Sequence, residues 1–182
     1  MSKKATKRAA IVAKLAGHFL ASGLEDTSLR RLADVAGTSD RMLLYYFENK
    51  DDLVVSVLTH IGDDLALVLE AKFADEPKPP AEVMRALWEL VKSVALADQL
   101  RLWLDLSSRA SRQDPLYMVI SEAMGEAWIK RLSALLDVPD AEKRAMAILI
   151  MATVDGQMFL FPTAPERGEI AIAKAIELLD RV

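Results

Sequence analysis

Cysteine is absent from this sequence of 182 residues, and histidine occurs only twice, as His18 and His60. Without cysteine, the chain can form neither a disulfide bond nor a thiolate metal site. The two histidines do not fall at a metal-ligand spacing. The sequence therefore predicts no bound metal ion and no cofactor.

Long hydrophobic runs are also absent. The longest one, residues 145–152, is far shorter than the roughly 20 apolar residues that a membrane-spanning helix needs. The N-terminus is polar and basic and contains no apolar signal core. We therefore expect a cytoplasmic protein without a membrane partner.

Sequence signatures of common enzyme classes are missing as well. We find neither a glycine-rich loop that would cradle phosphate groups nor the nucleophile elbow of hydrolases. The sequence thus predicts a protein that is not an enzyme, and no catalytic residue is assigned.

Charge is distributed unevenly along the chain. The formal net charge is −4, yet residues 1–50 contain nine Lys/Arg against five Asp/Glu, and the remainder contains 14 against 22. A small basic region can bind phosphate groups even when the whole chain is acidic. The asymmetry indicates two regions with different partners, with chance clustering on solvated faces as the alternative.

Apolar residues recur with the period of an α-helix along most of the sequence. In the N-terminal part this pattern predicts a first helix that ends at Gly23, a second over residues 29–36 and a short third after Ser39. A fourth helix is expected from Asn49 to about Lys72.

The prolines of the segment Asp75–Pro80 interrupt the helical pattern. Beyond them the periodicity predicts five more helices, near residues 80–96, 99–112, 115–136, 140–161 and 166–181. No alternating segment typical of a β-strand is present. We expect an all-α protein of about nine helices.

Two short helices separated by a glycine-containing turn predict a helix-turn-helix. Thr27 and Ser39 are suited to cap the two helices, and Gly37 can adopt the left-handed conformation that ends the first of them. Leu43 and Phe47 share the inward face of the second helix and would hold it in place.

The outward face of that second helix carries four large side chains, those of Arg41, Met42, Tyr45 and Tyr46. In the major groove of DNA, arginine pairs with guanine, an apolar side chain contacts a thymine methyl group, and tyrosine reaches phosphates. We expect one tyrosine to be partly structural and the other to reach the DNA backbone. Lys50, at the start of the next helix, is placed to meet a phosphate.

This stretch resembles the DNA-binding domain of the tetracycline-repressor (TetR) family. The resemblance rests on TSLRRLADVAGTS at 27–39, RMLLYYF at 41–47 and NKDDL at 49–53. The family typically shows Thr or Ser opening the second helix, A-G-V-S in the turn, L-Y-x-H-F in the third helix and K-x-x-L opening the fourth. The residues that match are Ala36, Gly37, Ser39, Leu43, Phe47, Lys50 and Leu53.

Three positions depart from the family pattern, since Thr38 replaces its valine, Leu44 its tyrosine and Tyr46 its histidine. The family tyrosine at the Leu44 position commonly contacts phosphate, so Tyr45 or Tyr46 would have to replace that contact. Asp40 can complement the helix dipole or accept a hydrogen bond from cytosine N4. We favour the first role because it requires no particular DNA sequence.

The resemblance implies a dimeric transcriptional regulator, most simply a repressor, that responds to a small-molecule effector. A three-helix DNA-binding domain over residues 1–50 would be joined to a helical bundle over residues 51–182 for ligand binding and dimerisation. The residues expected to contact double-stranded operator DNA are Thr27, Thr38, Ser39, Asp40, Arg41, Met42, Tyr45, Tyr46 and Lys50. The basic N-terminal residues can form an arm along the DNA or remain a mobile, solvated terminus; they are Lys3, Lys4, Lys7 and Arg8.

In the resembled family the C-terminal bundle encloses the effector pocket. This part of the chain contains all three tryptophans and several methionines, which suit a mostly apolar ligand. Ordinary core packing is the alternative for each candidate. The residues expected to bind the ligand are Trp88, Trp103, Arg109, Trp128 and Gln157, with Asp105 as a further polar candidate.

Residues 145–161 are apolar around most of the circumference of the expected helix, which indicates burial on more than one side. In the resembled family the last two helices form a four-helix interface with a second copy. The residues expected in such a homodimer are Ile148, Met151, Ala152, Gly156, Ile172 and Ile176. Asp155 would either bond across this interface or line the pocket.

Two alternatives to a ligand-responsive repressor remain open. One is a DNA-binding regulator of the same fold without a small-molecule effector. The other is an all-helical scaffold or enzyme in which the DNA-binding motif has decayed.

Overall fold

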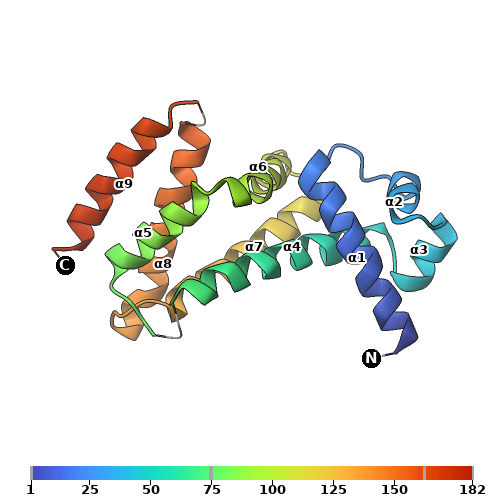
Figure 1. Ribbon diagram of the computed structural model, residues 1–182, viewed down its shortest axis with the longest axis horizontal. Helices are drawn as coiled ribbons and strands as arrows, with labels where there is room; N and C mark the ends of the chain where they lie inside the picture. Colours follow the sequence, from blue (N-terminus) through green and yellow to red (C-terminus); the bar gives the residue numbers. More distant parts are fainter. Residues whose placement is uncertain (1, 74–75, 162, 182) are drawn as a thin grey trace. The chain divides into compact units, whose positions relative to one another are not determined.

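The computed structural model describes residues 2–73, 76–161 and 163–181. Within these ranges the chain forms nine α-helices, one short 3-10 helix and no strand beyond an isolated bridge between Lys78 and Leu136. This confirms the predicted all-α fold. The helices (Figure 1) are α1 (Lys3–Ser22), α2 (Leu29–Ala36), α3 (Asp40–Tyr46), α4 (Lys50–Phe73), α5 (Pro80–Val91), α6 (Ala97–Ser111), α7 (Pro115–Ala134), α8 (Asp140–Leu160) and α9 (Pro165–Leu179).

The helix expected over residues 80–96 is shorter than predicted. It ends at Val91, and η1, a 3-10 helix (Val94–Leu96), follows a turn in which Ser93 has extended backbone angles. The sequence did not indicate this turn, because it contains neither glycine nor proline and the helical spacing of apolar residues continues across it. The predicted break before α5 is found at residues 76–79, whereas Asp75 lies outside the described residues.

The chain divides into two compact units. The first comprises Met1–Leu65 and Asp98–Met124, and the second comprises Ala66–Ala97 and Gly125–Val182. This division differs from the predicted boundary at residue 50, because α6 and the first part of α7 share the core of the N-terminal helices.

The core of the first unit draws on segments that lie far apart in the sequence. Phe19 of α1 and Leu43 of α3 belong to the same buried cluster as Leu106 of α6. Asp105 of α6 also accepts a hydrogen bond of 2.8 Å from the backbone N–H of Leu24, just after α1. Segments about 80 residues apart in the sequence are therefore needed to complete this core.

In the second unit, α5, α8 and α9 pack against one another. Gly168 of α9 lies against the ring of Trp88, and a Cβ added there would come within 3.0 Å of it. The Trp88 indole N–H donates to Glu169 over 3.1 Å, and Lys92 pairs with the same carboxylate at 2.9 Å. The hydrogen bonds from Lys92 and Trp88 hold the pKa of Glu169 below its usual value. Glycine at 168 thus allows α5 and α9 to approach closely.

Replacing Gly37 by alanine should lower the free energy of unfolding by about 1–2 kcal/mol, because Gly37 has φ +70° and a Cβ is unfavourable in that conformation. Gly17 provides a matched control inside α1, since a Cβ added there meets no atom within 4 Å. Gly17→Ala should raise stability by about 0.5–1 kcal/mol. Chemical denaturation measures both changes, and equal stabilisation by both would contradict the left-handed turn.

Candidate nucleic-acid interface and ligand pocket

The helix-turn-helix consists of α2, the turn at Gly37 and α3. Gly37 adopts the left-handed conformation, with φ 70° and ψ 42°. The backbone N–H of Thr38 then donates to the carbonyl of Ala33 over 3.0 Å, which closes the end of α2. The Ser39 hydroxyl accepts the N–H of Met42 at 3.3 Å and caps α3. The predicted roles of Gly37 and Ser39 are confirmed.

The start of α2 differs from the prediction by one residue. The cap is Ser28, whose hydroxyl accepts the N–H of Arg31 at 3.4 Å, and the prediction of Thr27 as the cap was wrong. Asp26 accepts the N–H of Ser28, and this bond holds the pKa of Asp26 below its usual value. The Thr27 hydroxyl lies 3.4 Å from that of Tyr117 instead. Both residue types suit a cap, so the sequence pattern did not distinguish these neighbours.

The inward face of α3 is anchored as expected. Leu43 is 0% exposed and Phe47, which directly follows α3, is 2% exposed. Tyr46 was expected to point outward, but it is half-buried and packs against the same core. Tyr45 is 58% exposed. Tyr46 therefore packs against the core, as expected of one of the two tyrosines, whereas the Tyr45 ring is exposed.

The outward face of α3 is broader than the sequence indicated. Arg41 is exposed, and so are Met42, Leu44 and Tyr45. Leu44, for which the sequence predicts only the loss of a phosphate contact, is 49% exposed. Its position three residues after Arg41 was the signal for its place on this face. Asp40 lies in the first turn of α3, directly after the cap, where it complements the helix dipole.

The start of α4 is fixed by a network centred on Asp52. The Asn49 side chain accepts the N–H of Asp52 at 2.8 Å, and the Asp52 carboxylate accepts the N–H of Glu48 at 3.0 Å. Arg8 of α1 donates to the same carboxylate over 3.2 Å and lies over the ring of Phe47 at 4.6 Å. Arg8 thus joins α1 to Phe47 and to the start of α4. It therefore fits neither of the two expectations for the basic N-terminal residues, an arm along DNA or a mobile, solvated terminus.

Eight of the nine residues expected to contact DNA fall within residues 38–50, in the turn, in α3 or at the start of α4. Lys50 is the first residue of α4 and is exposed. Thr27 and Thr38 are half-buried. The first unit therefore presents a short helix of large exposed side chains, followed closely by an exposed lysine.

The five residues expected to bind a ligand fall in different units. Trp103 and Arg109 belong to the first unit, and Trp88, Trp128 and Gln157 belong to the second. Trp103 packs against the core of the first unit, and Arg109 pairs with Asp105 at 3.0 Å. These contacts give both residues a structural role within the first unit.

Trp88 and Gln157 are brought together in the second unit, where both border Gly168. The side-chain N–H of Gln157 donates to the carbonyl of Thr153 over 3.3 Å. Its side-chain oxygen is buried and has no hydrogen-bond partner within the described part of the chain. Buried polar atoms are rarely left without a partner, so this oxygen is available to a donor group of a ligand or to water.

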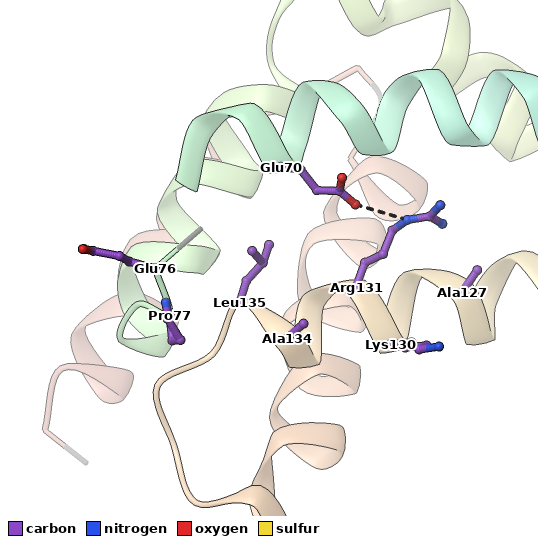
Figure 2. Close-up of a pocket in the computed structure, with 8 residues that line it drawn as sticks. All are labelled: Glu70, Glu76, Pro77, Ala127, Lys130, Arg131, Ala134 and Leu135. Carbon is purple, nitrogen blue, oxygen red and sulfur yellow. Dashed lines mark ion pairs between the residues drawn. The ribbon is translucent and has the colours of Figure 1, made fainter. Parts of the chain in front are cut away.

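A pocket of about 620 Å³ lies in the second unit, between α4, α7 and the segment that precedes α5. Figure 2 shows Glu70 of α4 and Arg131 of α7 pointing toward each other, and they pair at 3.5 Å. This volume is typical of small-molecule sites. None of the five predicted ligand residues lines this pocket, although Trp128 directly follows Ala127, which does. The lining residues are Glu70, Glu76, Pro77, Ala127, Lys130, Arg131, Ala134 and Leu135.

Helices α8 and α9 expose apolar side chains. Ile148 and Leu149 are 41% and 50% exposed on α8, and Ile170 is 71% exposed on α9. Ala152 is also exposed, whereas Met151, Gly156 and Ile176 are half-buried. The assignment of Ile172 to a dimer face was wrong. This residue is 1% exposed and faces the core of its own unit, because the helical period places it away from Ile170.

Within residues 2–73, 76–161 and 163–181, no three His, Cys, Asp or Glu side chains are grouped so that they would hold a metal ion. In the same part of the chain, no helix combines the length and the apolar character that crossing a bilayer demands.

Comparison with known proteins gives one family match. Residues 11–57 match the family model of the bacterial regulatory proteins of the tetR family. The matched segment extends from within α1 into α4 and contains all of α2 and α3.

Solved structures share the fold over nearly the whole chain. A TetR-family transcriptional regulator from Cytophaga hutchinsonii is 17% identical with a TM-score of 0.77, covering 100% of this chain and 97% of that one. A transcriptional regulator from Rhodococcus sp. Rha1 is 24% identical with a TM-score of 0.71, covering 94% and 95%. The multidrug binding protein EbrR, complexed with proflavin, is 23% identical with a TM-score of 0.68, covering 95% and 99%.

Proposed function

We propose that this chain, which belongs to the TetR family of DNA-binding transcriptional regulators, acts as a homodimeric repressor that a small molecule releases from its operator. The observation that carries the DNA-binding part is α3, a helix of seven residues whose outward side chains are large and exposed. In a helix-turn-helix, such a helix enters the major groove.

The side chains of α3 and α4 then divide between reading bases and meeting phosphates. Arg41 pairs with a guanine, while Met42 and Leu44 contact thymine methyl groups. Tyr45 and Lys50 meet phosphates and set the register of the protein on the duplex. Leu44 adds apolar base contact at the position where the family has a phosphate-binding tyrosine.

A homodimer supplies the symmetry that a palindromic operator requires. Its two copies of α3 would reach half-sites about 34–36 Å apart, one turn of DNA. The apolar residues exposed on α8 and α9, among them Ile148, Leu149 and Ile170, support an interface there, because monomers rarely leave large contiguous apolar patches exposed.

We place the effector in the second unit, beside Trp88 and Gln157. The buried oxygen of Gln157 lacks a partner within the described residues, and Trp88, which is 7% exposed, borders the same glycine, Gly168. A protein of the same fold, EbrR, binds proflavin, which supports a planar aromatic molecule as the class of ligand. To act as an inducer, the molecule must bind the DNA-incompetent state more tightly.

Proteins of this family are generally DNA-binding regulators rather than enzymes, and we propose that this chain likewise has no catalytic activity. We also propose a cytoplasmic location, where it meets its operator. An effector-free regulator of the same fold is the first alternative, and a helical scaffold or enzyme with a decayed motif is the second. Absence of any DNA binding at low salt would favour the latter.

Arg41→Ala should weaken binding to the operator by about 1–3 kcal/mol and relax the preference at one base pair, because a bidentate contact to guanine is lost. Lys50→Ala should weaken binding to all sequences similarly and reduce the salt slope by about one unit. Both are measured on an operator selected from a random duplex library. Unchanged affinity and discrimination for Arg41→Ala would refute the assignment of Arg41.

Gly156→Leu should weaken the dimer if Gly156 lies at the helix crossing. A Cβ added at Gly156 meets no atom within 4 Å of its own chain, which leaves room at this position for the close approach of a partner helix. Gly125→Leu is the matched control, since a Cβ at Gly125 also meets nothing within 4 Å. Sedimentation velocity separates the two, and a stable monomer of the unmodified chain at micromolar concentration would overturn the dimer.

Proflavin, followed by a panel of planar aromatic compounds, should quench tryptophan fluorescence and lower operator affinity at least about tenfold, which needs about 1.4 kcal/mol of coupling. Trp88→Phe should remove most of the quenching, whereas Trp103→Phe in the first unit should not. Compounds that quench Trp88 but leave operator affinity unchanged would put the effector-free alternative ahead.

A further inference from the structure

A groove in the first unit combines lysines of α1 with tyrosines of α3. Its volume is about 640 Å³. Three lysines from the first two turns of α1 form one wall, and two adjacent tyrosines of α3 form the other. The residues that characterise it are Lys3, Lys4, Thr6, Lys7, Tyr45 and Tyr46.

The aromatic wall of the groove is ordered by its neighbours. The ammonium group of Lys4 lies 4.6 Å from the centre of the Tyr45 ring. Tyr45 also meets Tyr46 edge to face, with ring centres 5.1 Å apart and planes at 79°. Tyr46 is anchored in the core of the unit. The exposed ring of Tyr45 is therefore held between a structural tyrosine and a lysine.

The positive charge of the groove is not neutralised by the chain itself. Arg8, on the same helix, pairs with Asp52 and lies over Phe47. By contrast, no carboxylate within the described ranges pairs with Lys3, Lys4 or Lys7, all three of which are exposed. The basic residues of α1 thus separate into one that holds the unit together and three that face outward.

These lysines do not stabilise α1. Its first turn contains no acidic residue, and cations near a helix N-terminus interact unfavourably with the helix dipole. Their positive charge is better explained by an anionic partner. Because the opposite wall belongs to α3, that partner lies along the helix that reads DNA.

We propose that this groove binds the DNA backbone, with Lys4 and Lys7 meeting phosphates and the Tyr45 hydroxyl donating a hydrogen bond to one. The inference rests on the proposed function. It adds contacts to the DNA backbone that come from α1, through Lys4 and Lys7, to those that come from α3. It also gives Tyr45 the phosphate contact that Leu44, an aliphatic residue in the family's tyrosine position, does not make.

The test uses the full chain and an operator that the unmodified protein selects from a random duplex library, with a mixed-sequence duplex alongside. Fluorescence anisotropy gives the affinity at several salt concentrations. Lys4→Gln/Lys7→Gln should lower the slope of log K against log[salt] by nearly two, since each phosphate contact contributes about 0.9. The loss should be similar on both duplexes, because phosphate contacts carry no sequence information.

Two further variants distinguish phosphate contacts in the groove from the general effect of lowering the net charge of the protein. Lys72→Gln/Lys130→Gln makes the same change in net charge within the second unit and should leave the slope nearly unchanged. Tyr45→Phe keeps the ring and its contact with Lys4 but removes the hydroxyl. It should lower affinity by about 2- to 10-fold without changing the slope.

Lys4→Arg/Lys7→Arg should restore the salt slope, which distinguishes loss of charge from loss of folding. A salt slope for Lys4→Gln/Lys7→Gln equal to that of the unmodified chain would overturn the groove while leaving the DNA-binding function intact. If the unmodified chain selects no operator and binds neither duplex at low salt, the proposed function itself fails.

Discussion

The burial of Leu43 and Phe47 is the constraint on which the proposed DNA-reading surface of α3 depends. Helix α3 has only seven residues, and isolated helices shorter than about 12–15 residues are marginal in water. Its conformation is therefore imposed by the core into which these two side chains insert. The turn at Gly37 and the Asp52 network fix the chain on either side of α3. The direction in which Arg41 and Tyr45 point follows from this packing.

Charge in the N-terminal region serves two purposes that sequence alone did not separate. Arg8 is half-buried between Phe47 and Asp52, where a planar guanidinium can stack and donate at once. The nearby lysines remain in solvent. Arg8 connects α1 to α4 inside the unit, whereas the lysines of α1 are exposed. The sequence does not distinguish these two roles, because Arg8 and Asp52 are 44 residues apart and meet only when α1 and α4 pack together.

The sequence predicted what depends on local interactions. The helix-turn-helix spacing, the left-handed Gly37, the cap at Ser39 and the inward faces of α1 and α3 all follow from periodicity and residue type within a few positions. The family resemblance then supplied the role of the motif. These features need no knowledge of what the rest of the chain does.

The errors arose where tertiary packing decides. Ile172 is expected from the sequence on the dimer face, yet the packing of α9 buries it at 1% exposure, while Ile170 is 71% exposed. Ser28 caps α2 instead of Thr27. The hydroxyl of Thr27 lies near that of Tyr117, which is 90 residues further along the chain. The tryptophans were grouped because they share one half of the sequence, but Trp103 belongs to a different unit from Trp88. Composition shows that such residues are buried, not which neighbours bury them.

The discontinuity of the first unit has a consequence for the newly made protein. Its core needs residues of α6 and α7, such as Leu106 and Ile120, in addition to the N-terminal helices. Synthesis adds about 5–20 residues per second, so residue 124 follows residue 65 by roughly 3–12 seconds. During this interval the core of α1 to α4 lacks the part of its packing that α6 and α7 supply. A nascent chain therefore completes the core that holds α3 late, when residue 124 of 182 has been made. The residues that we propose to read DNA are nevertheless among the first to be made.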